Sequence, residues 1–357
     1  MNPNFKDIEP YSDAEVPAAI RRVLLSPLFP YICYKINPKI KIFQLRRLFR
    51  SITTVDEFQR KVMLPMLLYV AKTTMNRFTC EGFDLLDNTK SYLFVSNHRD
   101  ITLDAALLDL LLLRHNLPAC EISFGDNLIA NPFVNDLARL NRMFPIHRGG
   151  TPREMYNASL HISQYIRYAL HEKHRSVWIA QRNGRTKDGD DRTEPGLLKM
   201  FTLDGPKDFV ENLTEINIVP VAISYEIEPC AKRKVHETQV KLRKGFYRKR
   251  RNEDMKSVLE GLLQQKGDVH FCICPPITRE EISTIWNVAN ENGVRNSNAA
   301  YKSMAELIDR RIHDGYRLHP SNLEAYNNLN AHCFEYPLNS EEDLLMRLYA
   351  KPVENRK

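Results

Sequence analysis

The sequence predicts an α/β fold, in which a mostly parallel central sheet is flanked by helices, with an N-terminal helical cap and a helical C-terminal extension. Between about residues 90 and 275, short β-rich runs alternate with helical patterns, and this rhythm is typical of parallel sheets. Residues 152–172 carry apolar side chains at helical spacing between two such runs, which predicts a crossover helix. We therefore divide the chain into residues 1–79, 80–275 and 276–357.

The N-terminal segment combines apolar and basic residues to an unusual degree. We expect residues 13–79 to be helical, and residues 18–50 contain eight cations and no acidic residue. One interpretation is an amphipathic segment lying on an anionic lipid surface. The other is a helical cap that packs on the main domain and exposes a solvated basic edge. The sequence alone leaves both open.

The start of the chain lacks the basic region and apolar core of a secretory signal, and its longest apolar runs fall well short of the roughly 18 residues that span a bilayer. The seven cysteines are scattered without the C-x-x-C spacing of a zinc site. We therefore expect reduced thiols, no metal, no transmembrane segment and a cytoplasmic location. The net charge of +7 indicates an anionic partner, such as a phospholipid surface, a phosphorylated substrate or nucleic acid.

Within the core we expect six strands, and the chain beyond them adds little chemistry. The predicted strands are residues 91–96, 120–124, 142–147, 176–180, 216–225 and 269–274. The basic run 241–251 has the composition of a solvated loop or of a second contact with a membrane or a nucleic acid. From residue 276 onward the sequence is polar and mostly helical.

Polar residues gather where the first core strand should end. His98 follows this strand, Asp100 is a natural N-cap for the next helix, and Asp104 lies one turn into that helix. Ligands of parallel sheets collect at the carboxyl ends of the strands. A neutral imidazole there can take a proton from a hydroxyl if a carboxylate orients it, and Asp104 is the better candidate for this task. The alternative is that His98 only terminates the strand.

Cations recur at later strand ends. Arg148 follows one predicted strand, and Arg182, Arg185 and Lys187 follow another, with Gly184 leaving room for a ligand near the backbone. If these strands are neighbours, the cations face His98 across one crevice and suit a phosphate group. A solvated loop is the alternative for residues 182–194, because acidic residues in the loop match its cations.

In order and spacing, these blocks resemble the glycerol-phosphate and lysophospholipid acyltransferase superfamily over residues 90–225. The stretch "NHRDITLD" is similar to the family's first block, "FPIHR" to the second, "IAQRNGRTKDG" to the third and "IVPVAISY" to the fourth. Two features depart from the family pattern. His98 and Asp104 are separated by five residues rather than four, and Asn183 stands where the family has a glutamate before Gly184.

The resemblance implies an O-acyltransferase of the glycerol-3-phosphate or 1-acylglycerol-3-phosphate type, without metal or cofactor. His98, oriented by Asp104 or Asp100, is implied to deprotonate an acceptor hydroxyl that attacks acyl-CoA or acyl carrier protein. Arg148, Arg185 and Lys187 are implied to hold the acceptor phosphate.

The acceptor is then a phosphorylated glycerol or a lysolipid, with Arg182, Asn183 and Gly184 as possible parts of its site. The partner surface is a membrane to which the protein binds peripherally, and no nucleic acid is expected. The alternatives are a catalytically silent lipid-binding relative and a basic nucleic-acid-binding protein.

Overall fold

The computed structural model describes residues 4–126, 131–147, 149–250, 252–291, 296–331 and 336–357. Seven strands within these ranges form one sheet with the order β1-β7-β6-β2-β5-β3-β4. In chain order the strands are β1 (Met75–Glu81), β2 (Leu93–Ser96), β3 (Glu121–Gly125), β4 (Met143–Ile146), β5 (Val177–Ala180), β6 (Ile218–Tyr225) and β7 (Gly267–Ile273). All neighbouring pairs are parallel except β6 and β7. The predicted fold class and its six strands are therefore confirmed.

Strand β1 is a correction to the sequence prediction, which expected helix up to residue 79. The helix ends at Thr74, and residues 75–81 pair with β7 along the edge of the sheet. No glycine or proline separates residues 75–81 from the long apolar helical run before them. The sequence therefore has no local signal for the change from helix to strand. The strand forms because β7 offers it a partner, which is a tertiary effect.

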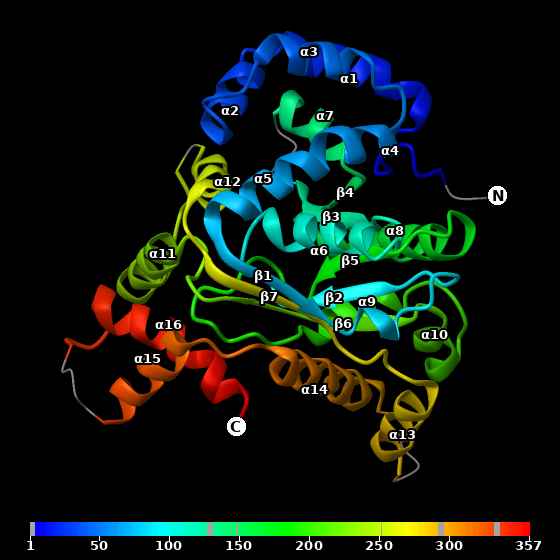
Figure 1. The fold of residues 1–357 in the computed structure, drawn as a ribbon. Coiled ribbons are helices and arrows are strands. Elements are labelled where there is room, and N and C mark those ends of the chain that lie inside the picture. The colour runs from blue at the N-terminus through cyan, green and yellow to red at the C-terminus, as the bar shows by residue number, and fades with distance from the viewer. Residues whose placement is uncertain (1–3, 127–130, 148, 251, 292–295, 332–335) are drawn as a thin grey trace.

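Helices cover both faces of the sheet (Figure 1). One face is buried under α5 (Leu64–Thr74), α6 (Leu103–Arg114) and α12 (Glu253–Leu263). The other is buried under α8 (Pro152–Arg167), α9 (Pro195–Phe201), α10 (Phe209–Glu215), α13 (Arg279–Ala289) and α14 (Ser297–Gly315). Helix α8, continued by a π-helical turn at Tyr168–Glu172, is the predicted crossover helix. Its Tyr165 and Ile166 are fully buried against the sheet.

The N-terminal helices form a separate layer. They are α1 (Val16–Leu25), α2 (Leu28–Ile36), α3 (Ile42–Arg50) and the short α4 (Val55–Phe58), which runs through a π-helical segment, Gln59–Met63, into α5. Their apolar residues pack with Phe133 and Leu140 of α7 (Pro132–Leu140), so a cap on the main domain is present. No helix of the described ranges is by itself long and apolar enough to cross a bilayer; the pair Asp13–Leu25 and Leu28–Ile36 meets that criterion only jointly and is bent by 82°.

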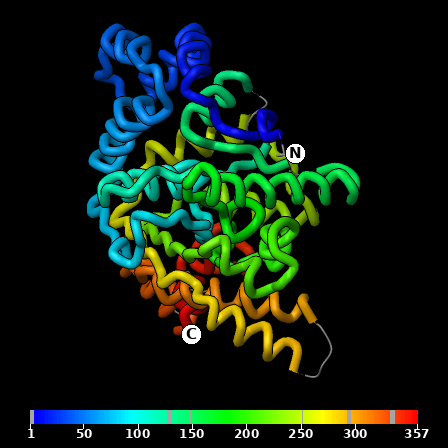
Figure 2. The backbone as a smooth tube through the Cα atoms, turned by 90° about the vertical axis from the view of Figure 1, so that its right-hand side faces the viewer, coloured from blue at the N-terminus to red at the C-terminus, as the bar shows by residue number. Residues whose placement is uncertain are grey.

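The C-terminal helices lie on the side of the sheet away from the N-terminal layer (Figure 2). After α14, helices α15 (Pro320–Asn330) and α16 (Glu341–Asn355) pack as a pair, and α16 also contacts α11 (Ala231–Lys244). The carboxyl end of strand β6 lies beside this C-terminal group, because the N–H of Glu228, three residues after β6, donates to the hydroxyl of Tyr349 on α16 (2.9 Å). The predicted three-part division of the chain stays a proposal.

Candidate active site

The end of strand β2 is tied to strand β6 by a buried asparagine. The amide nitrogen of Asn97 donates to the carbonyl of Ile223 (2.9 Å), and its amide oxygen accepts from the N–H of Ile223 (2.8 Å). Because β2 is only four residues long while β6 continues beyond it, this side chain replaces the missing ladder bonds. The next residue, His98, is therefore held at a defined place on the rim of the sheet.

His98 forms a hydrogen bond to Asp104. Its Nδ1 lies 2.9 Å from Oδ2 of Asp104, and the two side chains are 13% and 1% exposed. The edge of the imidazole also packs against Trp178 of β5, with ring centroids 5.7 Å apart. With Nδ1 bound to a carboxylate, Nε2 is the nitrogen that can accept a proton from a substrate.

Asp104 is itself held by three further hydrogen bonds. Its Oδ2 accepts from the N–H groups of Arg99 (2.6 Å) and Asp100 (2.9 Å), and its Oδ1 accepts from the hydroxyl of Tyr225 (3.0 Å). Burial, with Asp104 as the nearest anion, keeps the pKa of Tyr225 well above its ordinary value, so this hydroxyl remains a donor. These contacts leave the carboxylate one orientation toward His98.

Asp100 has a different task. Its Oδ1 accepts from the N–H groups of Thr102 and Leu103, both at 2.8 Å, so it supports the start of α6. The prediction that Asp100 is the N-cap is wrong, because Thr102 occupies that position. The helix begins at Leu103, two residues later than expected. The turn 99–102 accommodates the fifth residue between His98 and Asp104, one more than the family has. It places Asp104, in the first turn of the helix, next to His98. Of the two carboxylates predicted to orient His98, Asp104 is the one that lies within hydrogen-bond distance.

The loop 181–194 follows β5, the neighbour of β2. Its Thr186 N–H donates to the carbonyl of His98 (2.9 Å), which ties the loop to the segment that carries the imidazole. Gly184 has a φ of +76° and open space on the side where a Cβ would lie, and Asn183 is exposed. The residues around Gly184 therefore form the open rim of the site next to His98.

The cations of this loop differ in how they are bound. Arg182 donates to the carbonyl of Asp190 (3.1 Å) inside the loop, and Lys187 pairs with Glu237 of α11 (2.7 Å). Burial, together with the neighbouring Arg185, lowers the pKa of Lys187 to about 8. In the described part of the chain, the buried Nη1 of Arg185 has no hydrogen-bond partner. The buried Nε of Arg182 also lacks a partner there, so Arg185 and Arg182 are the loop cations with a donor to offer to an anion.

The second predicted cation group is not tested. Arg148 lies outside the described residues. The strand before it, β4, is separated from β2 by β5 and β3, so the two strand ends are not adjacent as the prediction required. The neighbouring His147 is bound to Asp126 (2.6 Å), which follows β3.

A buried ionic cluster that the sequence did not predict surrounds the side chain of Arg99, the residue after His98. Arg99 is 1% exposed, and its guanidinium pairs with Asp191 and with Glu228 (3.2 Å). Lys234 is equally buried and donates to Glu228 (2.5 Å) and to the carbonyl of Arg99 (2.7 Å). The alternative of a solvated loop, in which Asp191 balances cations of its own segment, is therefore wrong for this residue. Two cations and two anions compensate each other here, as buried charges must.

Two residues that support the site could have been suspected from the sequence. Tyr225 ends the predicted strand 216–225 and therefore lies at the same rim as His98, and Asn97 directly precedes the histidine. The ionic cluster carries no such signal, because its members come from three separate segments, at residues 99, 191 and 228–234.

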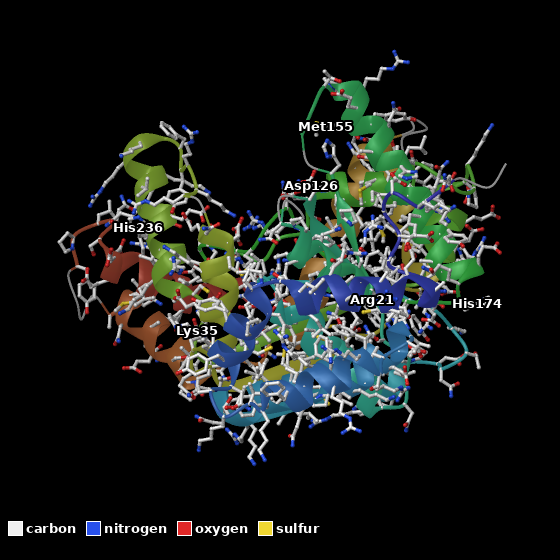
Figure 3. All side chains as sticks on the ribbon, turned by 90° about the horizontal axis from the view of Figure 1, so that it is seen from above. Arg21, Lys35, Asp126, Met155, His174 and His236 are labelled. Carbon is white, nitrogen blue, oxygen red and sulfur yellow. The ribbon has the colours of Figure 1, made fainter. Side chains whose placement is uncertain are left out.

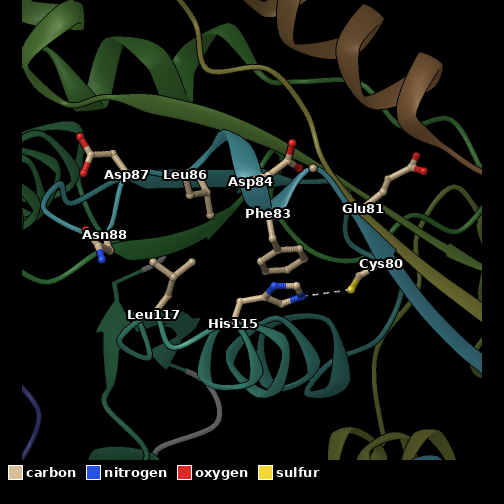
Figure 4. Close-up of a pocket in the computed structure, with 10 residues that line it drawn as sticks. Cys80, Glu81, Phe83, Asp84, Leu86, Asp87, Asn88, His115 and Leu117 are labelled. Atoms are coloured by element: carbon tan, nitrogen blue, oxygen red, sulfur yellow. Dashed lines mark hydrogen bonds between the residues drawn. The ribbon is translucent and has the colours of Figure 1, made fainter.

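No group of three or more His, Cys, Asp or Glu side chains in the described ranges is arranged to hold a metal ion. The prediction that catalysis needs neither a metal nor a cofactor stays a prediction. A surface hollow of about 740 Å³ is present elsewhere, lined by residues that include Cys80, Phe83 and His115 (Figure 4). This hollow lies at the carboxyl end of α6, whereas His98 lies near the amino end of the same helix. Helix α6 has twelve residues and is therefore roughly 18 Å long, so the hollow is separate from the site around His98.

Comparison with known proteins decides the family of the central region. A family model described as "Acyltransferase" matches residues 77–224, which include His98, Asp104 and the loop 181–194. Residues 77–224 are an acyltransferase domain. No curated protein matches the chain.

Among solved structures, the 1-acyl-sn-glycerophosphate (LPA) acyltransferase PlsC from Thermotoga maritima is similar to this chain. The two share 12% identity with a TM-score of 0.39, over 85% of this chain and 94% of that one. This similarity is too weak to assign a substrate to the acyltransferase domain described above.

Proposed function

We propose that the acyltransferase domain moves a fatty acyl group from an acyl thioester to a hydroxyl of a glycerol-phosphate or lysophospholipid acceptor. The observation that carries this proposal is the bond between His98 and the buried, fully bonded carboxylate of Asp104. A histidine that merely ended the strand would need no such partner. The same bond favours an enzyme over a catalytically silent relative.

In this reaction His98 acts as a general base. Nε2 takes the proton of the acceptor hydroxyl while the oxygen attacks the thioester carbonyl, and Asp104 stabilises the imidazolium that forms. The carbon–sulfur bond then breaks, and the imidazolium returns its proton to the leaving thiolate. Holding both substrates at one rim supplies much of the acceleration, and the base adds about 10² to 10⁴.

The acceptor is proposed to carry a phosphate. Arg185 has an unused buried donor in the described structure, and Lys187 lies beside it as a second cation. Arginine binds phosphate through its fork of donors, and a helper lysine adds charge. Arg182 supports the loop from within, and Asn183 and Gly184 line its open side. Arg148 stays a proposed further phosphate ligand on the resemblance of the second block alone, since its strand β4 is not a neighbour of β2.

We further propose that the protein works in the cytoplasm on a membrane surface. The N-terminal layer exposes large apolar side chains beside its cations: Leu25 (85% exposed), Tyr31 (50%), Tyr34 (60%) and Phe43 (86%). Arg21 and Lys35 mark the same layer in Figure 3. Apolar residues among cations suit an anionic bilayer, where insertion and charge attraction add.

Vesicle binding tests the membrane proposal. The protein should sediment with vesicles of phosphatidylglycerol and phosphatidylcholine, and the double variant Leu25→Glu/Phe43→Glu should lose most of this binding. The control is Leu338→Glu, which changes a leucine that is 75% exposed in the C-terminal extension. Equal binding by the double variant and the control would contradict the proposal, and RNA binding in its place would favour the nucleic-acid alternative.

A panel of substrates tests the reaction. Labelled acyl-CoA and acyl carrier protein are offered with glycerol 3-phosphate, lysophosphatidate, an unphosphorylated glycerolipid and a zwitterionic lysolipid. We expect transfer to a phosphorylated acceptor, and Arg185→Ala should raise the KM for that acceptor more than it lowers kcat. One feature favours the alternative of a catalytically silent lipid-binding relative: Asn183 stands where the family has a glutamate. A folded protein that binds lipid but transfers to none of these acceptors would establish that alternative.

A further inference from the structure

The C-terminal extension contacts the loop 181–194 at three points. Asp309 of α14 accepts from the N–H of Thr193 (2.7 Å), and Nε2–H of His313 donates to the carbonyl of Asp191 (2.7 Å). From α16, the amide of Asn355 donates to the carbonyl of Gly189 (3.1 Å). All three contacts reach the backbone of the loop, so they constrain its path.

Gly189 shows how closely helix α16 approaches. The φ of this glycine is +82°, and a Cβ added to it would lie 2.7 Å from the carbonyl oxygen of Leu348. Only glycine fits both this backbone conformation and this contact. The helix therefore packs directly on the loop backbone.

The extension also reaches the residue that follows the proposed base. The guanidinium of Arg99 lies over the ring of Tyr316, which follows α14, at 5.1 Å from the centroid. On α16, the hydroxyl of Tyr349 accepts from the N–H of Glu228 (2.9 Å), and Glu228 is the second anion of Arg99. Arg99 thus connects the C-terminal helices with the turn between His98 and Asp104.

We infer that the C-terminal extension completes the active site: His313, Tyr316 and Asp309 are positioning residues that hold the loop 181–194 and Arg99 against His98. None of them lies in the matched acyltransferase segment 77–224. This inference rests on the proposed function for its catalytic consequence, but the contacts themselves can be tested without it.

The chain of contacts explains how a helix outside the domain affects the imidazole. His313 fixes Asp191, Asp191 binds the Arg99 guanidinium, and the Arg99 N–H donates to Asp104. In parallel, Thr186 of the same loop donates to the carbonyl of His98. Displacing the loop would therefore shift both the base and its phosphate-binding neighbours, and a misplacement of about 1 Å can cost up to about 10²-fold in rate.

Two matched pairs of variants test the inference. His313→Leu removes the donor to Asp191, whereas His313→Gln keeps an N–H that can reach the same carbonyl. Tyr316→Leu removes the ring beneath Arg99, whereas Tyr316→Phe keeps it. His161→Leu is the control, since it changes a histidine of α8 that pairs with Asp7 outside this region.

We expect His313→Leu and Tyr316→Leu to lower kcat by about tenfold to a hundredfold while the KM for the acyl donor stays within about twofold. The Gln and Phe variants should stay within a few-fold of the wild type. Hydrogen exchange of the peptide covering residues 182–191 should quicken in the Leu variants only, and not in His161→Leu. Losses of equal size in His313→Gln and His313→Leu would overturn the positioning role.

The outcomes separate this inference from the proposed function. A wild type that transfers no acyl group contradicts the function, and hydrogen exchange then tests the contacts alone. Unchanged exchange of residues 182–191 in His313→Leu overturns the inference whether or not the enzyme is active. Should His313→Leu fail to fold, Asn355→Ala, which removes one donor to Gly189, carries the same expectation for exchange.

Discussion

Asp104→Asn changes one carboxylate oxygen into an amide nitrogen and removes the negative charge beside His98. In the wild type, Oδ2 accepts from His98 and from two backbone N–H groups, and Oδ1 accepts from Tyr225. The asparagine can direct its single oxygen at the three donors on the first side and its NH₂ at the Tyr225 hydroxyl, which can also accept. The local geometry can therefore survive while the charge is lost.

The size of the effect follows from what the carboxylate does. A general base contributes about 10² to 10⁴, which equals roughly 2.7 to 5.4 kcal/mol of activation free energy. Without the charge, the imidazolium formed during the reaction is not stabilised, so we expect kcat to fall by about 10² to 10⁴. The free energy of unfolding should fall by about 1.5 to 3 kcal/mol, because hydrogen bonds to a charged acceptor become bonds to a neutral one.

The assay is initial-rate acyl transfer for the wild type, Asp104→Asn, His98→Ala and the double variant. If the two residues act as one unit, the double variant loses no more than His98→Ala alone, because the carboxylate acts only through the imidazole. A double variant whose loss equals the product of the two single losses would refute this reasoning. So would an Asp104→Asn variant with an unchanged rate.

Three further predictions concern titration and packing. Lys187 is charged below its pKa of about 8, so the KM for a phosphorylated acceptor should rise between about pH 7 and 9. Lys187→Arg should flatten that rise. The same dependence of KM on pH in the wild type and in Lys187→Arg would exclude Lys187 from the site. Burial raises the pKa of Asp109 from 3.8 to about 6, so the folded protein binds this proton more tightly than the unfolded chain does. The proton therefore stabilises the folded protein by about 3 kcal/mol below about pH 4, and this stabilisation is lost as the pH rises through 6. Urea unfolding of Asp109→Asn should show this slope removed, and an unchanged slope would contradict the assignment. Gly261→Ala places a Cβ 2.1 Å from Oδ2 of Asp100 and should cost about 1 to 3 kcal/mol of stability in thermal unfolding, whereas Gly196→Ala, with open space around it, should cost little.

The regular alternation of the sequence was enough to predict most of the sheet. Strands β2, β3 and β6 are short apolar runs, and their burial on both faces is what such runs indicate. Strand β1 escaped prediction because its partner, β7, lies far along the chain: Thr79 and its partner His270 are 191 residues apart. Pairing over such a distance leaves no mark in a local window.

The site was predictable only where it is local in sequence. His98, Asp100 and Asp104 lie within seven residues, and a helix start brings them together. The role of Asp191 depends on Arg99, Glu228 and Lys234, which the fold gathers from distant segments. A charged residue in a polar loop looks solvated until its buried partner is known, so the ionic cluster and the part played by the C-terminal helices became visible only in three dimensions.

His98→Ala tests the central claim most directly. Acyl transfer from labelled acyl-CoA and acyl carrier protein to a phosphorylated acceptor is compared between the wild type and this variant, with circular dichroism and thermal unfolding as checks that both are folded. We expect the wild type to transfer the acyl group and the variant to lose about 10² to 10⁴ in rate. A folded His98→Ala variant that transfers as fast as the wild type would contradict the assignment of His98 as the base.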